Sequence, residues 1–161
     1  MTSDAFIAWA MKQPEASHYE LVAGEVGAIA RECSVHALTK ARIWRRMAEA
    51  VEAHGLPCQV YPDAMAVELD EHTVYEPDAL VRFGTPFPAD AIKPDDPVIV
   101  VDVLTPSTRA RDTGTKLEDY FCLPSLRHYL IVKTENRSVI HHARGADGII
   151  LTRIVREGPI G

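Results

Sequence analysis

A nearly continuous run of branched apolar residues, flanked by prolines, occupies positions 97–106 with the sequence Pro-Val-Ile-Val-Val-Asp-Val-Leu-Thr-Pro. Such a run predicts a strand in the middle of a sheet, covered on both faces, because a half-exposed strand alternates apolar with polar side chains. One carboxylate, Asp102, interrupts it. Burying an ionised carboxylate is costly unless the group is protonated, hydrogen-bonded or bound to a cation. Asp102 is therefore predicted to have a partner.

Length and composition predict a single globular domain over residues 1–161. Apolar residues make up 47% of the chain and charged residues 25%, which is the usual balance of a soluble domain with a core. No apolar run approaches the roughly 20 residues that a membrane helix needs, and residues 1–11 lack the pattern of a secretion signal. We therefore expect a cytoplasmic protein.

Charge and cysteine content argue against some classes of function. A formal net charge of -6 argues against a protein that coats nucleic acid nonspecifically, although an enzyme that grips phosphates needs only a local basic patch. Cys33, Cys58 and Cys122 are scattered and form no C-x-x-C pair, so neither a disulfide framework nor a cysteine zinc site is expected. We interpret the three thiols as core residues.

Hydrophobic periodicity and turn residues predict a mixed α+β chain rather than regular βαβ alternation. Besides the strand around Asp102, helices are expected over residues 5–11, 34–54 and 112–121, and strands over 19–22, 26–31, 58–67, 73–82, 126–132, 138–142 and 149–155. Pro77 should bend the strand over 73–82 or make it begin afresh at Asp78. The expected helix N-caps are Ser3 or Asp4, Ser34 and Asp112. The sequence contains no glycine-rich nucleotide-binding loop and no H-E-x-x-H zinc motif, so those enzyme classes are not indicated.

The helix over residues 34–54 has the clearest apolar stripe. Its members recur at helical spacing and are Val35, Leu38, Ala41, Trp44, Met47, Ala48 and Val51. The other face carries the basic residues Lys40, Arg42, Arg45 and Arg46. We expect these to be either solvated or turned toward phosphates. His36 lies in the first turn, off the stripe.

A second carboxylate and a lysine are expected near Asp102. Asp78 follows Pro77 at the opening of another strand, and Lys116 lies on the helix that follows the strand of Asp102. Two adjacent carboxylates make a hard-oxygen site suited to Mg²⁺ or Mn²⁺, because a divalent cation removes their repulsion. With a lysine beside it, such a site fits metal-assisted hydrolysis of a phosphate ester.

Three motifs, taken in order, resemble one protein family. They are Glu76-Pro77-Asp78, then residues 101–108, then residues 111–117 with Tyr120. Together with the segment 19–25 and with His36, they resemble the Uma-two family of bacterial endonucleases, placed in the PD-(D/E)XK restriction-nuclease superfamily. The resemblance covers most of the chain, from about residue 6 to residue 132.

The resemblance implies a restriction-endonuclease-like αβββαβ core, in which helices flank a central mixed sheet, with an extra N-terminal hairpin and C-terminal strands. It implies that Asp78, Asp102 and the carbonyl of Val103 bind Mg²⁺ or Mn²⁺ and that Lys116 is the catalytic lysine. His36 would be an auxiliary ligand or would orient water. The implied reaction is cleavage of a DNA phosphodiester. We also expect a homodimer without an organic cofactor.

Two positions depart from the family pattern. The superfamily's usual lysine, two residues after the second acid, is Leu104 here, so its role would pass to Lys116. Family members commonly have glutamate where this chain has Asp102, and the shorter side chain moves the carboxylate by about one methylene.

Other interpretations of these residues stay open. Asp102 could accept hydrogen bonds from the turn at 105–108, Lys116 could be solvated, and Asp112 could be a plain cap. The chain would then be a catalytically silent nuclease-fold protein that binds nucleic acid or a protein partner, or a structural homo-oligomer. Glu20 and Glu25 are interpreted as surface or strand-edge acids.

Overall fold

The computed structural model describes residues 1–14, 17–63, 65–94, 96–104 and 113–156. The predicted turn at 105–108 and the predicted cap Asp112 lie outside these ranges. Within them, the helices are α1 (Ser3–Ala10), α2 (Ser34–Ala53) and α3 (Thr113–Phe121). The strands are β1 (Tyr19–Val22), β2 (Glu25–Ala28), β3 (Cys58–Pro62), β4 (Val67–Asp70), β5 (Thr73–Tyr75), β6 (Ala79–Phe83), β7 (Pro97–Leu104), β8 (His128–Lys133), β9 (Ser138–Arg144) and β10 (Ile150–Arg156).

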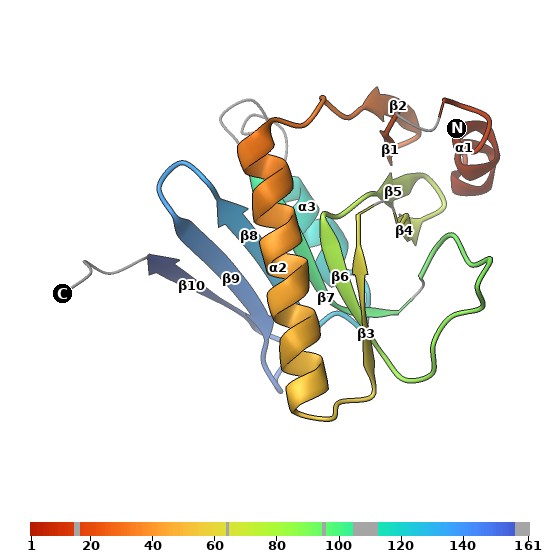
Figure 1. Cartoon of the computed structure of the whole chain (residues 1–161). Coiled ribbons are helices and arrows are strands. Elements are labelled where there is room, and N and C mark those ends of the chain that lie inside the picture. The colour runs from red at the N-terminus through yellow and green to blue at the C-terminus, as the bar shows by residue number, and fades with distance from the viewer. Residues whose placement is uncertain (15–16, 64, 95, 105–112, 157–161) are drawn as a thin grey trace.

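β7 is a central strand of the large sheet, as its apolar run predicts. In the described part of the chain this sheet has six strands in the order β10-β9-β8-β7-β6-β3. β7 runs antiparallel to β6 and parallel to β8. α2 covers the β3, β6 and β7 half of one face, and α3 lies behind the sheet (Figure 1). Val100, Val101 and Val103 are at most 3% exposed, which confirms a covered strand.

The main core lies between the large sheet and α3. Its buried members are Val67, Tyr75, Leu80, Val100, Tyr120, Leu123, Leu126, Tyr129 and Ile131. Three of them are tyrosines in contact, because the ring centroids of Tyr75 and Tyr129 lie 5.4 and 4.9 Å from that of Tyr120. Tilted and edge-to-face pairs of this kind stabilise a core beyond their apolar burial. The aromatic group therefore fixes α3, which carries Lys116, against the sheet.

A smaller sheet packs against α1. Among the described strands its order is β2-β1-β5-β4, and Phe6, Leu21 and Val74 are buried together between the helix and this sheet. The turn from β1 to β2 uses Gly24 at φ 83°, a conformation that glycine adopts without strain. The Gly24 N–H donates to the His72 carbonyl at 2.8 Å, which joins this hairpin to the turn between β4 and β5.

Two long predicted strands are each divided. The first division corrects the prediction from sequence, because β3 ends at Pro62 and β4 begins only at Val67, the last residue of the strand expected over 58–67. The second division agrees with the break predicted at Pro77, because the strand expected over 73–82 becomes β5 and β6. β3 pairs with β6 in the large sheet, whereas β4 pairs with β5 in the small one. The second division falls at Glu76-Pro77-Asp78, where Pro77 has no N–H to donate to a ladder. Asp78 therefore lies where the chain passes from the small sheet to the large one.

The predicted cap of the first helix is wrong. Thr2, rather than Ser3 or Asp4, is the N-cap of α1, and its Oγ1 accepts from the Ala5 N–H at 3.4 Å. Ser3 is buried and donates its hydroxyl to the Asp70 carbonyl at 2.6 Å. The Ser3 side chain, which was predicted to cap the helix, is thus hydrogen-bonded to the small sheet instead.

The cysteines also differ from their prediction. Cys33 and Cys122 are exposed and Cys58 is half-buried, so they are not core thiols. Cys33, rather than Ser34, occupies the N-cap position of α2, without a side-chain hydrogen bond to the helix.

The inward face of α2 differs from the predicted apolar stripe. Four members of that stripe are exposed, namely Val35 (49%), Leu38 (56%), Ala41 and Trp44 (39%). Lys40, predicted on the outer face, is only 9% exposed. His36 and Lys40 face acidic side chains at the edge of the large sheet, Asp78 and Asp63. The side of α2 that faces the sheet is therefore the side on which His36 and Lys40 pair with these acids.

Candidate functional site

Asp78 is fixed against β7 by two hydrogen bonds. Its backbone N–H donates to the Val101 carbonyl at 3.0 Å, and its Oδ2 accepts from the Val103 N–H at 2.6 Å. These two partners are the neighbours of Asp102 on either side. The junction between the sheets therefore holds Asp78 beside the part of β7 that carries Asp102.

His36 reaches the same place from the first turn of α2. Its Nε2 lies 3.0 Å from the Val103 carbonyl oxygen and 3.5 Å from Asp78 Oδ2. The contact with Asp78 is the largest effect on the pKa of His36 and raises it above the ordinary value, although partial burial opposes this. The structure thus brings together Asp78, Val103 and His36, three of the residues predicted from the sequence.

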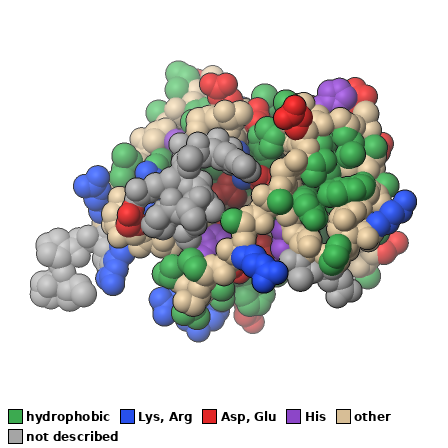
Figure 2. Space-filling view, turned by 90° about the horizontal axis from the view of Figure 1, so that it is seen from above, with side chains coloured by type: hydrophobic (Ala, Val, Ile, Leu, Met, Phe, Trp, Pro, Cys, Tyr) green, Lys and Arg blue, Asp and Glu red, His purple; other side chains and the backbone are tan. Residues whose placement is uncertain are grey.

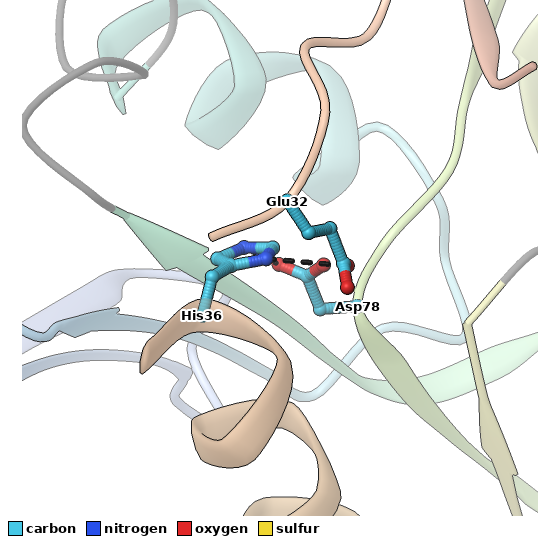
Figure 3. A group of neighbouring side chains, drawn as sticks. All are labelled: Glu32, His36 and Asp78. Atoms are coloured by element: carbon cyan, nitrogen blue, oxygen red, sulfur yellow. Dashed lines mark hydrogen bonds and ion pairs between the residues drawn. The ribbon is translucent and has the colours of Figure 1, made fainter. Parts of the chain in front are cut away.

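Glu32 joins this group, although no pattern in the sequence indicated it. Its Oε1 lies 3.2 Å from His36 Nδ1. Figure 3 shows the side chains of Glu32, His36 and Asp78 converging, and their ligand atoms lie within 4.8 Å of one another. Carboxylate oxygens and an imidazole nitrogen at this spacing suit a divalent cation such as Mn²⁺. Among the described residues, this three-residue group does not include Asp102.

Asp102 is buried on the other side of the junction and has two partners. Tyr129 donates its hydroxyl to Asp102 Oδ2 at 2.8 Å, and Lys116 Nζ lies 3.8 Å from the same oxygen. Burial raises the pKa of Asp102 to about 6, and the Lys116 ammonium opposes that rise. The nearby charge of Asp78 raises the pKa further. The partner that the sequence required for Asp102 is thus a tyrosine together with a lysine.

Glu20 holds Lys116 and was not selected from the sequence. The Lys116 ammonium donates to Glu20 Oε1 at 2.8 Å, and the Glu76 N–H donates to the same oxygen at 3.2 Å. The Glu20 side chain is only 14% exposed, and β1 lies between β2 and β5, so Glu20 is not the surface or strand-edge acid that was expected. One signal was present, because Glu20 lies in the segment 19–25 that resembles the family. Its contacts join β1, α3 and the Glu76-Pro77-Asp78 motif.

Comparison with solved structures defines the class of fold. A crystal structure described as a "putative nuclease belonging to DUF820" from Anabaena variabilis matches with a TM-score of 0.74, over 98% of this chain and 85% of that chain. Sequence identity is 14%, so the likeness establishes the fold, which is the mixed α+β nuclease-like architecture predicted above. No curated protein matches the sequence significantly.

The family follows from the sequence as a whole. The Uma2 family, described as "Putative restriction endonuclease", matches residues 3–159. The chain therefore belongs to the Uma2 family, which confirms the resemblance drawn from its motifs. Membership and fold support a nuclease, whereas the metal and the catalytic roles of individual residues stay predictions. None of the helices in the described ranges is long and apolar enough to cross a membrane.

Proposed function

We propose that this protein is a metal-dependent endonuclease that hydrolyses DNA phosphodiester bonds. The observation that carries the proposal is the position of Asp78 against the backbone on either side of Asp102, with Lys116 beside Asp102. Asp78 is hydrogen-bonded to both backbone neighbours of Asp102, and Lys116 lies 3.8 Å from Asp102. Two acids and a lysine suit the hydrolysis of a phosphodiester with a divalent cation.

The donor set fits Mg²⁺ or Mn²⁺, because it offers hard oxygens from Asp78, Asp102 and the Val103 carbonyl. His36 would be an auxiliary ligand or would orient water. A bound cation would activate water and offset charge on the phosphate. For Nε2 of His36 to bind the cation, that nitrogen must carry no proton and must turn away from the Val103 carbonyl oxygen, which it now faces at 3.0 Å.

We assign to Lys116 the role of orienting the nucleophile or of offsetting the negative charge that develops during the reaction. Its ammonium is held between Glu20 and Asp102 at 2.8 and 3.8 Å. It also lies 4.8 Å from the centre of the Tyr75 ring, where a cation is attracted to the aromatic face. These contacts preset the position of the ammonium, which is what electrostatic stabilisation of a transition state needs.

The protein must bind its DNA substrate through local contacts rather than through its overall charge. The net charge is -6, and acidic and basic side chains are interspersed on the face seen in Figure 2. The binding of DNA therefore depends on specific basic groups close to the site and on the cation itself.

A catalytically silent nuclease-fold protein is the second candidate. The observation that favours it is that Leu104, at the place of the superfamily's in-strand lysine, packs against the main core. Asp102 would then be a buried acid that only accepts a hydrogen bond from Tyr129. This candidate predicts DNA or protein binding without metal-dependent cleavage.

Nicking of a supercoiled plasmid in Mg²⁺ or Mn²⁺ separates the two candidates. The wild type should nick, and Asp102→Ala should lose at least about two orders of magnitude in rate. Asp90→Ala changes an exposed acid in a loop and should behave as wild type. Equal nicking by wild type and Asp102→Ala, or no metal-dependent nicking, would sink the proposal.

A further inference from the structure

Lys40 is a buried lysine that the proposed chemistry does not use. It lies one turn after His36 on α2 and is 9% exposed. Its ammonium contacts the carboxylates of Glu32 and Asp63, and it lies 3.7 Å from Asp78 Oδ1. A lysine is rarely buried unless it is paired, and here three carboxylates surround it.

Lys40 shares its partners with the candidate cation group. Glu32 Oε1 contacts both Lys40 and His36 Nδ1. Asp78 presents Oδ1 to Lys40 and Oδ2 to His36. Of the carboxylates around Lys40, Asp63 is the one outside the group formed by Glu32, His36 and Asp78. The ammonium therefore lies next to the position that a divalent cation on Glu32 and Asp78 would take.

The surroundings leave room for the exchange of one cation for another. A cavity of about 310 Å³ opens beside this cluster, and Glu32, Lys40, Asp63 and Asp78 are among the residues that line it. The carboxylates of Glu32 and Asp63 are 39% and 43% exposed, so water and ions can reach them. A lysine side chain has a flexible stem, which allows its ammonium to move among these oxygens.

We propose that Lys40 is a resident counter-ion that competes with the divalent cation for Glu32 and Asp78, and that Asp63 holds the ammonium when the divalent cation binds. Two cations in contact with the same carboxylates repel each other. Asp63 lets Lys40 leave the shared oxygens without becoming an unpaired buried charge. Lys40 is thus a positioning residue that sets the affinity of the site for the divalent cation. This inference rests on the proposed function, which places a cation at Asp78, and it adds Glu32 to the ligands of that cation.

Mn²⁺ binding tests the inference without reference to cleavage. Free Mn²⁺ is measured by electron paramagnetic resonance in titrations of the wild type, Lys40→Met and Lys40→Arg at neutral pH. Removing the ammonium should tighten Mn²⁺ binding by about tenfold, because the repulsion is lost. Lys40→Arg keeps the charge and should stay within about twofold of the wild type. Lys93→Met is the matched control, since Lys93 pairs with Asp4 and Glu68 away from this group.

A second variant guards against a purely structural effect. Asp63→Asn removes the alternative partner of Lys40, so Mn²⁺ binding should weaken by about threefold or more although Asp63 is not a ligand. Opposite shifts in Lys40→Met and Asp63→Asn support the competition. Circular dichroism and a thermal melt in chelator establish that each variant is folded, and if Lys40→Met does not fold, the Asp63→Asn titration decides alone.

Three outcomes overturn the inference. The first is unchanged or weaker Mn²⁺ binding by folded Lys40→Met, and the second is unchanged or tighter binding by Asp63→Asn. The third is absence of Mn²⁺ binding from the wild type and all variants. Intact Mn²⁺ binding with the predicted shifts but without DNA cleavage would instead refute the proposed function and leave the role of Lys40 standing.

Discussion

Asp102 is an acid whose surroundings oppose its charge. It is 6% exposed, and burial raises its pKa from 3.8 to about 6 despite the nearby Lys116 ammonium. Without a bound cation, the folded protein therefore holds a proton on Asp102 at pH values where the unfolded chain has already lost it. A buried acid of this kind lowers the stability of the metal-free protein at neutral pH.

Asp102→Asn should therefore change how stability depends on pH. Between about pH 4 and pH 6 the folded wild type binds more protons than the unfolded chain, so its free energy of unfolding falls as pH rises. The loss should approach roughly 3 kcal/mol for a pKa difference of this size. The variant lacks this loss and should be the more stable protein at about pH 7.5. Urea unfolding in chelator at both ends of this range measures the difference, and parallel pH profiles would contradict it.

Glu20 should matter for cleavage through Lys116. In Glu20→Gln the ammonium loses the charge that holds it at 2.8 Å and shifts from its place, so the single-turnover cleavage rate should fall on the order of tenfold. Mn²⁺ affinity should change less than the cleavage rate, because Glu20 is not one of the proposed ligands Asp78, Asp102 and the Val103 carbonyl. Glu25→Gln alters an exposed acid of the same hairpin and serves as the control. If Glu20→Gln cleaved DNA at the rate of the wild type, Glu20 would not be a positioning residue for Lys116.

Residues of the site differ in how far the sequence could indicate them. Asp102 could be selected from the sequence because a carboxylate in an apolar strand needs a partner. Glu20 and Lys116 are 96 positions apart, so no local pattern shows that they meet. The burial of Lys40 could not be predicted from the apolar periodicity of its helix. It depends on Asp63, which follows β3, and on Asp78, which precedes β6.

At the scale of elements, α3 is held by an aromatic group with one unfavourable member. The Tyr120 hydroxyl is buried and has no hydrogen-bond partner among the described residues. The ring itself packs between Tyr75 and Tyr129. The ring thus stabilises the core whereas the hydroxyl costs free energy.

Tyr120→Phe should consequently keep or raise stability, by up to about 1 kcal/mol, because it removes an unsatisfied polar group. Tyr129→Phe is the matched change, since the Tyr129 hydroxyl donates to Asp102 at 2.8 Å, and it should cost about 1–3 kcal/mol. Chemical denaturation of both variants at one pH gives the comparison. Equal losses in the two variants would show that the Tyr120 hydroxyl is satisfied after all.

The order and type of most elements followed from the sequence, whereas the assignment of strands to sheets did not. Apolar runs and turns predicted β7 and the strands from β8 to β10 to within a few residues. The alternation over residues 58–67 gave no sign that the first strand ends at Pro62 and that Val67 joins another sheet. Pro77 marked a break in the second run, but only pairing in three dimensions determines which partner each half takes.

At the scale of the whole molecule, the two sheets contribute different parts of one site. The large sheet supplies Asp102, α2 supplies His36, α3 supplies Lys116 and the small sheet supplies Glu20. The N-terminal hairpin is therefore not a mere addition to the nuclease-like core, because it holds the lysine. The expected homodimer stays a prediction, which sedimentation equilibrium measures directly.

The central claim is that Asp78 and Asp102 share a divalent cation beside Lys116. A crystal soaked in Mn²⁺, with anomalous diffraction recorded, tests it most directly. The account predicts an anomalous peak at about 2.0–2.4 Å from carboxylate oxygens of Asp78 and Asp102 and from the Val103 carbonyl. A fully soaked crystal with no peak at Asp78, or with a peak that Asp102 does not approach, would contradict the claim.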